Sequence, residues 1–253
     1  MLPIARVFGL SLQTPLLAVL IGLMLAVELA RRLASQRGLD GNTIANALAN
    51  SMFAFVLGAR LGYVFSNLSS YLKDPFGALA LNTTAMLPWT GWLAAAVFAA
   101  WTLHRKHTLK VELAHVLLPA ACVLGMGLAV SDLLSGNNFG TPTTLPWAIN
   151  LWGALRHPVQ VYEFLMLGLA LIALLRINTR NRPTHAYIWI GIALVAFGRV
   201  WVDGFRAEVP LLVGLRVTQL AGVLITLVAL WQLGEGLKPA NNPIEIAPEV
   251  QQV

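Results

Sequence analysis

Long apolar runs alternate with short polar segments along most of this chain. Seven runs are long enough, or nearly so, to cross about 30 Å of hydrocarbon as helices. They cover residues 15–30, 44–65, 86–103, 113–134, 159–175, 186–202 and 213–233. The first and fifth are short by this measure, so we expect them to extend into their flanks. The pattern predicts an all-α integral membrane protein, a bundle of about seven transmembrane helices.

The ends of the chain differ from this pattern. Residues 1–235 are predicted to form a single transmembrane domain, and the proline-containing segment 236–253 a disordered cytoplasmic tail. Residues 1–12 carry one charge, Arg6, and lack a small-residue cleavage pattern, so we interpret them as a retained amphipathic lead-in. Residues 66–85 are expected to include a short amphipathic helix in the membrane interface.

Composition supports the membrane assignment. The chain is 57% hydrophobic and 11% charged, with a mean hydropathy of +0.71, whereas soluble domains carry about 25% charged residues. The net charge of +6 is therefore interpreted as a topology signal rather than a nucleic-acid surface. The single cysteine, Cys122, excludes an intrachain disulfide and a thiol-rich metal site.

Basic residues concentrate in alternate loops. Nine follow the first, third and fifth runs: Arg31, Arg32, Arg37, Arg105, Lys106, Lys110, Arg176, Arg180 and Arg182. Four lie in the other loops: Lys73, Arg156, Arg206 and Arg216. Because cytoplasmic loops carry the excess of basic residues, this distribution predicts an outside N-terminus and a cytoplasmic C-terminus. Five tryptophans then fall near the outer boundary, where an aromatic belt accounts for them without a ligand: Trp89, Trp92, Trp147, Trp152 and Trp201.

The segment 157–163, HPVQVYE, stands where a polar loop gives way to the fifth apolar run. Pro158 suits the first turn of a helix, where its missing N–H costs nothing. Gln160 and Glu163 then share one helix face. A carboxylate in hydrocarbon costs about 2.5–3.5 kcal/mol on insertion scales, so Glu163 needs either a partner with a function or a route to water at the helix end.

Ionisable groups gather at one predicted depth. With this topology, four helices bring Arg60, Asp132, Glu163, Arg199 and Asp203 to the outer half of the membrane. One interpretation is structural ion pairing, of Arg199 with Asp203 and of Arg60 with Glu163. The other is that the arginines face a cavity and hold an anion whose tail stays in the membrane. Buried ion pairs contribute little to stability, and clustering at one depth favours the site.

Three motifs make the chain similar to a known family. They are GARLGYV at 58–64, HPVQVYE at 157–163, and Gly198-Arg199 followed by Asp203 and Arg206. Over nearly its whole length the chain resembles bacterial prolipoprotein diacylglyceryl transferases, with PWA at 146–148 and Gln219 in the expected order. That family moves the diacylglyceryl group of phosphatidylglycerol onto the lipobox cysteine thiol of exported prolipoproteins. The resemblance implies a multi-pass enzyme of the bacterial plasma (inner) membrane, with no cofactor, no metal and no nucleic-acid partner.

The resemblance also suggests roles for individual residues. Glu163 would accept the thiol proton, with His157 as a second candidate base. Arg60 and Arg199 would bind the phosphate, and Asp203 would orient Arg199. The expected substrate-binding residues are Arg60, Gln160, Tyr162, Asp132, Asn137 and Arg206.

Several positions depart from the family pattern. Trp89 stands where the family has a histidine, Ala129 where it has an arginine, and Pro15 where it has a tyrosine. Asp132 replaces an asparagine and Asp203 a glutamate. A phosphate-binding arginine and a candidate base are therefore missing together. The alternative function is a non-catalytic homologue that binds anionic phospholipid or lipopeptide.

A small-solute transporter is a third possibility, since charges within membrane segments also mark ion paths. We find no internal repeat and no charges spread across both leaflets, as such transporters usually have. The sequence also lacks a Gly-rich nucleotide-binding pattern and the paired Cys/His spacing of zinc sites.

Overall fold

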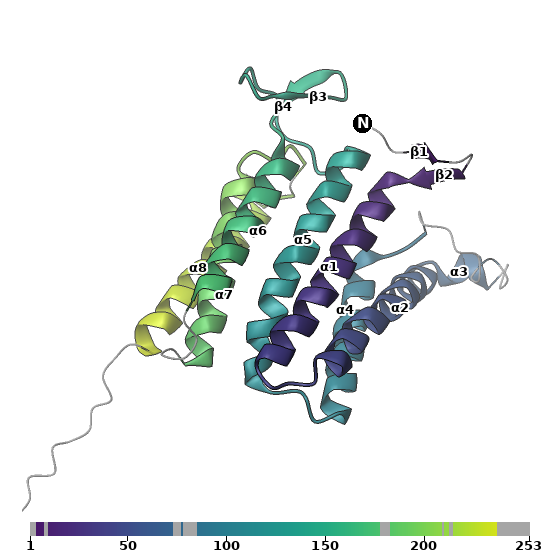
Figure 1. Ribbon diagram of the computed structural model, residues 1–253. Coiled ribbons are helices and arrows are strands. Elements are labelled where there is room, and N and C mark those ends of the chain that lie inside the picture. Colours follow the sequence, from purple (N-terminus) through teal and green to yellow (C-terminus); the bar gives the residue numbers. More distant parts are fainter. Residues whose placement is uncertain are drawn as a thin grey trace, which may run out of the picture.

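The computed structural model describes residues 4–7, 10–72, 77, 85–177, 183–208, 210–212 and 215–236. Seven long helices dominate these residues (Figure 1). They are α1 (Thr14–Gln36), α2 (Gly41–Ser66), α4 (Pro88–Arg105), α5 (Ala114–Ser135), α6 (Val159–Arg176), α7 (Thr184–Asp203) and α8 (Val217–Gly236). Each predicted run corresponds to one of them, and α1 extends beyond its run as expected. The predicted tail lies outside the described residues, except for Gly236.

Short elements join the long helices. One helical turn, α3 (Leu68–Tyr71), follows α2 within the segment where an interfacial helix was expected, and η2 (Val111–Leu113) precedes α5. Residues 73–76 and 78–84 of that segment lie outside the described part. Three antiparallel hairpins were not predicted: β1 (Ile4–Val7) with β2 (Leu10–Gln13), β3 (Ile149–Leu151) with β4 (Ala154–Arg156), and β5 (Leu211–Leu212) with β6 (Leu215–Arg216).

Within the described part of the chain, five helical segments are long and apolar enough to cross a membrane by length and composition. They are α2, the segment Val111–Ser135 with η2 and α5, and the helices α6, α7 and α8. An integral membrane protein built from helices is consistent with these segments. The seven-span count and its orientation stay predictions.

The start of α2 shows how the sequence sets a helix boundary. The Asp40 carboxylate accepts hydrogen bonds from the backbone N–H groups of Asn42 and Thr43 and from the Thr43 hydroxyl. These bonds, led by the one from the Thr43 side chain, hold the pKa of Asp40 below its usual value. A capping aspartate therefore begins the helix several residues before its apolar run.

Small residues allow neighbouring helices to approach closely. A Cβ atom placed on Gly22 of α1 would lie 2.7 Å from the Cα atom of Gly127 of α5, and one on Gly91 of α4 would meet Phe55 of α2. A cluster of buried residues then joins one end of these four helices: Ala26, Ala30, Leu33, Ala34, Ile44, Ala47, Leu103, Leu113, Val116 and Ala120. Close approach through small residues is typical of helices packed within a membrane.

The hairpin β3–β4 stands at the same end of the bundle as the N-terminal hairpin, beyond the start of α6 (Figure 1). Its two-residue turn consists of Trp152 and Gly153, both with positive φ, at 54° and 77°. Such a turn matches the twist of a hairpin. The indole of Trp152 donates to the carbonyl of Gly136 (3.0 Å), so the hairpin is fixed to the end of α5.

Candidate functional site

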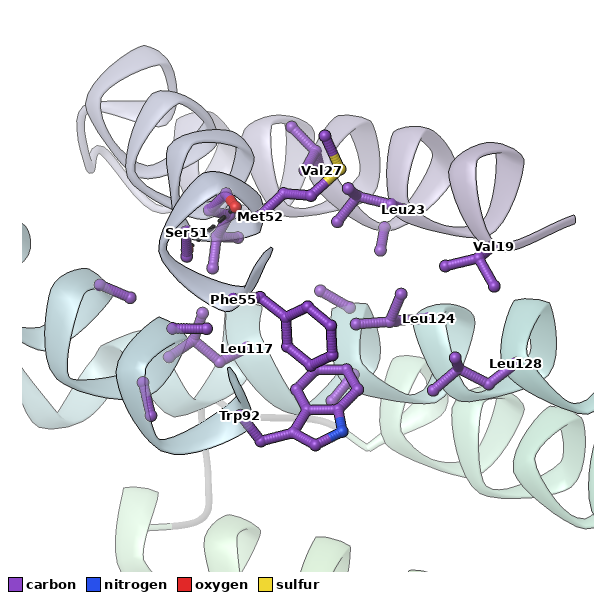
Figure 2. Close-up of a pocket in the computed structure, with 17 residues that line it drawn as sticks. Val19, Leu23, Val27, Ser51, Met52, Phe55, Trp92, Leu117, Leu124 and Leu128 are labelled. Atoms are coloured by element: carbon purple, nitrogen blue, oxygen red, sulfur yellow. Dashed lines mark hydrogen bonds between the residues drawn. The ribbon is translucent and has the colours of Figure 1, made fainter. Parts of the chain in front are cut away.

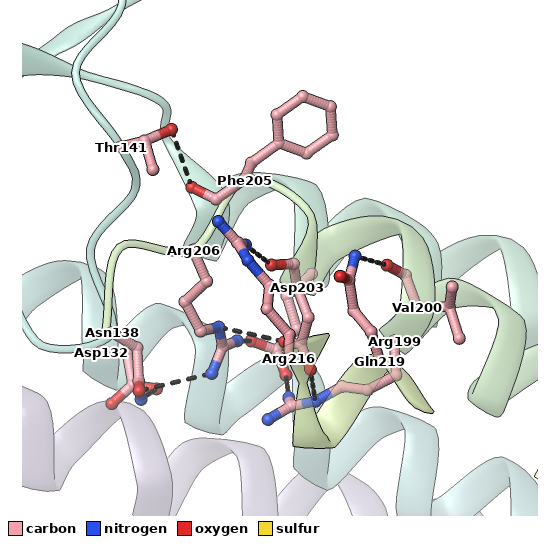
Figure 3. A network of polar contacts seen from close by, with 11 residues as sticks. Asp132, Asn138, Thr141, Arg199, Val200, Asp203, Phe205, Arg206, Arg216 and Gln219 are labelled. Atoms are coloured by element: carbon pink, nitrogen blue, oxygen red, sulfur yellow. Dashed lines mark hydrogen bonds and ion pairs between the residues drawn. The ribbon is translucent and has the colours of Figure 1, made fainter. Parts of the chain in front are cut away.

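Four charged side chains form a closed ring of ion pairs where α6 begins and α7 ends. Arg199 Nη1 donates to Glu163 Oε1 (2.5 Å), and Arg206 Nη2 donates to Glu163 Oε2 (2.7 Å). Asp203 closes the ring, with Oδ2 at 3.4 Å from Arg199 Nε and Oδ1 at 3.3 Å from Arg206 Nε (Figure 3). Each cation contacts both anions. Because the ring contains two arginines and two carboxylates, their formal charges cancel. We call these four residues the ionic ring.

The ring is buried on one side and open on the other. The side chains of Asp203 and Arg206 are 1% and 7% exposed, that of Glu163 is 20% exposed, and that of Arg199 is 42% exposed. Asp203 contacts both guanidinium groups, yet neither of its oxygens makes a hydrogen bond of good geometry with a described residue. Arg199 is therefore the cation that a ligand can reach with least rearrangement.

A third arginine supports the buried corner. Arg216 Nη1 donates to the backbone carbonyl of Asp203. Gln219 of α8 donates to the carbonyl of Val200 (3.1 Å), which ties α8 to the last turns of α7 (Figure 3). The sequence predicts Arg216 only as one of the loop charges. Its contact with the Asp203 carbonyl was missed, because a contact with the backbone leaves no pattern in the sequence.

The loop after α5 contacts the ring through an amide. Asn138 Oδ1 accepts from Arg206 Nη1 (3.3 Å), and Asn138 Nδ2 donates to Asp132 Oδ2 (2.6 Å). The neighbouring carbonyl of Asn137 accepts from Gln160 Nε2 (2.6 Å). Gln160 is buried, and its Oε1 has no partner among the described residues. The structure thus brings Asp132, Asn137 and Gln160 to the same end of α5 and α6 as the ionic ring.

His157 and Tyr162 belong to a separate aromatic cluster. His157 Nδ1 lies 3.3 Å from the Tyr162 hydroxyl, which also accepts from the indole of Trp147 (2.8 Å). The Tyr162 ring packs on Trp201 and Phe205, with centroids 5.6 and 5.7 Å apart. Trp147 and Trp201 were expected only as belt residues; their contacts to Tyr162 join segments distant in the chain and could not be inferred from spacing.

Arg60 is engaged elsewhere. Its guanidinium donates to the carbonyls of Ala85 (2.8 Å) and Gly77 (2.7 Å) and lies over the ring of Tyr71. Arg60 belongs to α2, which packs on α4 and α1, whereas the ionic ring lies on α6, α7 and the turn after α7 (Figure 1). The suggested pairing of Arg60 with Glu163 is wrong for the state described, because Arg199 and Arg206 occupy both oxygens of Glu163.

Two cavities flank α5. One of about 200 Å³ touches Glu163 and Arg199, and its other lining residues are apolar or glycine: Gly125, Met166, Leu167, Leu194, Val195, Gly198 and Val202. The other, about 500 Å³, lies between α1, α2, α4 and α5. Inside it the rings of Phe55 and Trp92 meet edge to face at 4.9 Å (Figure 2). Of the described residues that line it, Ser51 alone carries a hydroxyl, which donates to the backbone of its own helix.

Three apolar residues that depart from the family pattern lie on α1, α4 and α5. Ala129 is buried in α5. Trp89, in the first turn of α4, is 63% exposed, and Pro15 is in the first turn of α1. Among the described residues, no group of three or more His, Cys, Asp or Glu side chains is arranged to hold a metal ion.

Comparison with known proteins identifies the family. A family model described as prolipoprotein diacylglyceryl transferase matches residues 3–234. The phosphatidylglycerol–prolipoprotein diacylglyceryl transferase of Geobacter sulfurreducens is 32% identical over 206 residues, which cover 77% of this chain and 79% of that protein. The enzyme of the same name from Finegoldia magna is 28% identical over 226 residues, covering 87% and 89%. The resemblance seen in the motifs is thereby confirmed, and the chain belongs to the prolipoprotein diacylglyceryl transferase family.

Proposed function

We propose that this protein transfers the diacylglyceryl group of phosphatidylglycerol to the cysteine thiol of an exported lipobox peptide, at the outer face of a bacterial inner membrane. The observation that carries the proposal is the position of the ionic ring. The half-buried Arg199 and the more deeply buried Glu163 share a cavity whose remaining lining is apolar or glycine. A phospholipid needs both surroundings, a cation for its phosphate and apolar walls for its chains.

The reaction itself is a displacement at carbon. The thiolate sulfur forms a bond to the glyceryl carbon, the bond from that carbon to the phosphate oxygen breaks, and the electron pair leaves with glycerol phosphate. The thiol proton must pass to a base, and the phosphate must be neutralised as it departs. Glu163 is our base and Arg199 our phosphate ligand, since a planar guanidinium binds phosphate through two parallel N–H groups.

The ionic ring suggests how binding prepares the base. In the closed ring, Arg199 occupies Oε1 of Glu163. A lipid phosphate that binds Arg199 competes directly for this guanidinium and releases Oε1. Arg206 remains bonded to Oε2, so the carboxylate keeps its place and gains a free oxygen for the thiol proton. His157 is a weaker candidate, because its Nδ1 faces the Tyr162 hydroxyl.

A specific observation supports a second candidate, the non-catalytic binder of anionic phospholipid or lipopeptide. Ala129 and Trp89 stand where the family has an arginine and a histidine. Losing one electrostatic contact to a developing anion typically costs about 10²–10³ in rate. We therefore expect transfer that is slow compared with that of family members that keep both residues.

Purified protein in phosphatidylglycerol-containing detergent micelles, incubated with a lipobox peptide, provides the test. Mass spectrometry should find the diacylglyceryl adduct on the peptide, and a peptide with serine in place of the cysteine should stay unmodified. Replacing phosphatidylglycerol with phosphatidylethanolamine should reduce the product. Binding of phosphatidylglycerol without any adduct would favour the non-catalytic binder.

A further inference from the structure

The pair Asp132 and Asn138 connects the loop after α5 to the ionic ring without contacting the cavity beside Glu163. Among the described residues, Arg206 donates hydrogen bonds to Glu163 and Asn138 and forms an ion pair with Asp203. We infer that Asp132 and Asn138 are positioning residues, which hold Arg206 on Glu163 when the lipid phosphate draws Arg199 away. This inference rests on the proposed function.

The chemistry of the amide fixes its orientation. A guanidinium can only donate, so the Asn138 oxygen must face Arg206 and its NH₂ group must face Asp132. Asp132 therefore has to accept, which a carboxylate does with both oxygens. Asn138 Nδ2 accordingly donates to Asp132 Oδ2 (2.6 Å). Reversing the amide would place an NH₂ group against a cation.

The backbone holds Asn138 in an uncommon conformation. Its φ is 52°, a left-handed value that residues other than glycine adopt rarely and asparagine most readily. The loop is also fixed to the segment after α7: Thr141 N–H donates to the Phe205 carbonyl (2.8 Å) and Ala207 N–H to the Phe139 carbonyl (3.0 Å). The loop and Arg206 are thus held as one unit, which keeps the amide within reach of the guanidinium.

The expected effect on the reaction follows because the lipid phosphate and Glu163 compete for the same two arginines. A phosphate beside Glu163 attracts Arg206 as well as Arg199. If Arg206 also moved, Glu163 would lose both partners and its orientation. The Asn138 amide gives Arg206 a neutral acceptor that does not compete with Glu163 for a proton. Loss of this acceptor should therefore lower kcat and leave the KM for lipid, which depends on Arg199, nearly unchanged.

Asn138→Gly is the sharpest variant, because glycine keeps the positive φ without strain and removes only the amide. Its kcat should fall about tenfold, as for a lost hydrogen bond to a charged group, with KM for phosphatidylglycerol within about twofold. Asp132→Asn retains an acceptor oxygen and should keep most of the activity, whereas Asp132→Leu should resemble Asn138→Gly. Asn150→Ala, which alters an exposed asparagine of β3, is the control and should match the wild type.

The outcomes separate the two proposals. An Asn138→Gly variant with wild-type kcat would overturn the positioning role while the wild type still transfers. A raised KM with unchanged kcat would also overturn it and assign Asn138 to lipid binding. Absence of transfer by both the wild type and Asn150→Ala would instead reject the proposed function, and this inference with it.

Discussion

The two sides of α5 contrast sharply. On one side, α5 with α1, α2 and α4 encloses a cavity of about 500 Å³ with almost wholly apolar walls. On the other, α6 and α7 bring the ionic ring beside a smaller cavity of about 200 Å³. The departures at Pro15, Trp89 and Ala129 fall on α1, α4 and α5, whereas Glu163 and Arg199 of the matching motifs lie on α6 and α7.

The ion pairs of the proposed site thus lie on one side of α5, while Arg60 of the motif at 58–64 lies on the other side and bonds to backbone carbonyls. At three positions where the motif resemblance implies a tyrosine, a histidine and an arginine, this chain has apolar residues, and all three are on helices that line the larger cavity. The family motifs on α6 and α7 remain linked through the ring. Under the proposed function, the reaction takes place on the ring side, and the larger cavity makes no polar contact that the reaction requires.

The orientation of both halves in the membrane is the first prediction, and its effect should be all-or-none. In a Cys122→Ala background, Ser69→Cys and Lys106→Cys each provide one exposed thiol. An impermeant thiol reagent should label Ser69→Cys in intact cells and Lys106→Cys only after permeabilisation. Outside labelling of Lys106→Cys would invert the topology and place the ring at the cytoplasmic face.

Removing a cation from the buried corner of the ring should have the next largest effect, a loss of stability. Arg206→Leu leaves two carboxylates with Arg199 alone, and breaking a buried ion pair costs about 3–5 kcal/mol. Unfolding of the detergent-solubilised protein should show this loss. Arg32→Leu is the matched control, because Arg32 forms an exposed pair with Glu28 and should barely matter. Equal stability of the two variants would show that the ring contributes no more than a surface pair.

A charge-balanced change should separate folding from binding. Arg199→Leu with Asp203→Leu removes one cation and one anion and leaves Arg206 with Glu163. Stability should be unchanged or slightly higher, while affinity for phosphatidylglycerol should fall about tenfold or more, as expected when a charged hydrogen-bond partner of the phosphate is lost. Native mass spectrometry can measure the bound lipid. Unchanged binding would remove Arg199 from the proposed site.

A substitution in the larger cavity should change the transfer rate least. Ala95→Phe places a ring in space lined by α4 and α5. Acyl chains gain little hydrophobic free energy on leaving lipid for an apolar pocket, so we expect the transfer rate to change by less than about threefold. A loss as large as that of Arg199→Leu with Asp203→Leu would mean that the larger cavity contains the reacting part of the lipid.

The sequence predicted the helices well, since long apolar runs are local signals, but it missed the start of α2 at the Asp40 cap. It also predicted that Glu163, Arg199 and Asp203 lie at one depth, because depth in a membrane is set by position along a helix, but it did not predict the pairing of Arg199 with Glu163. It did not predict the partners of Arg60, because depth says nothing about which helices are neighbours. The hairpin β3–β4 was missed because its strands are three residues long and its turn uses Trp152 at positive φ.

The most direct test of the account compares Glu163→Gln with the wild type in a single preparation, measuring phosphatidylglycerol binding and peptide transfer together. If Glu163 is a base that the lipid phosphate frees from Arg199, the variant should bind phosphatidylglycerol at least as tightly and transfer about 10²–10⁴-fold more slowly. Transfer at the wild-type rate would exclude Glu163 as the base. Loss of lipid binding by Glu163→Gln would contradict the exchange of partners at Arg199.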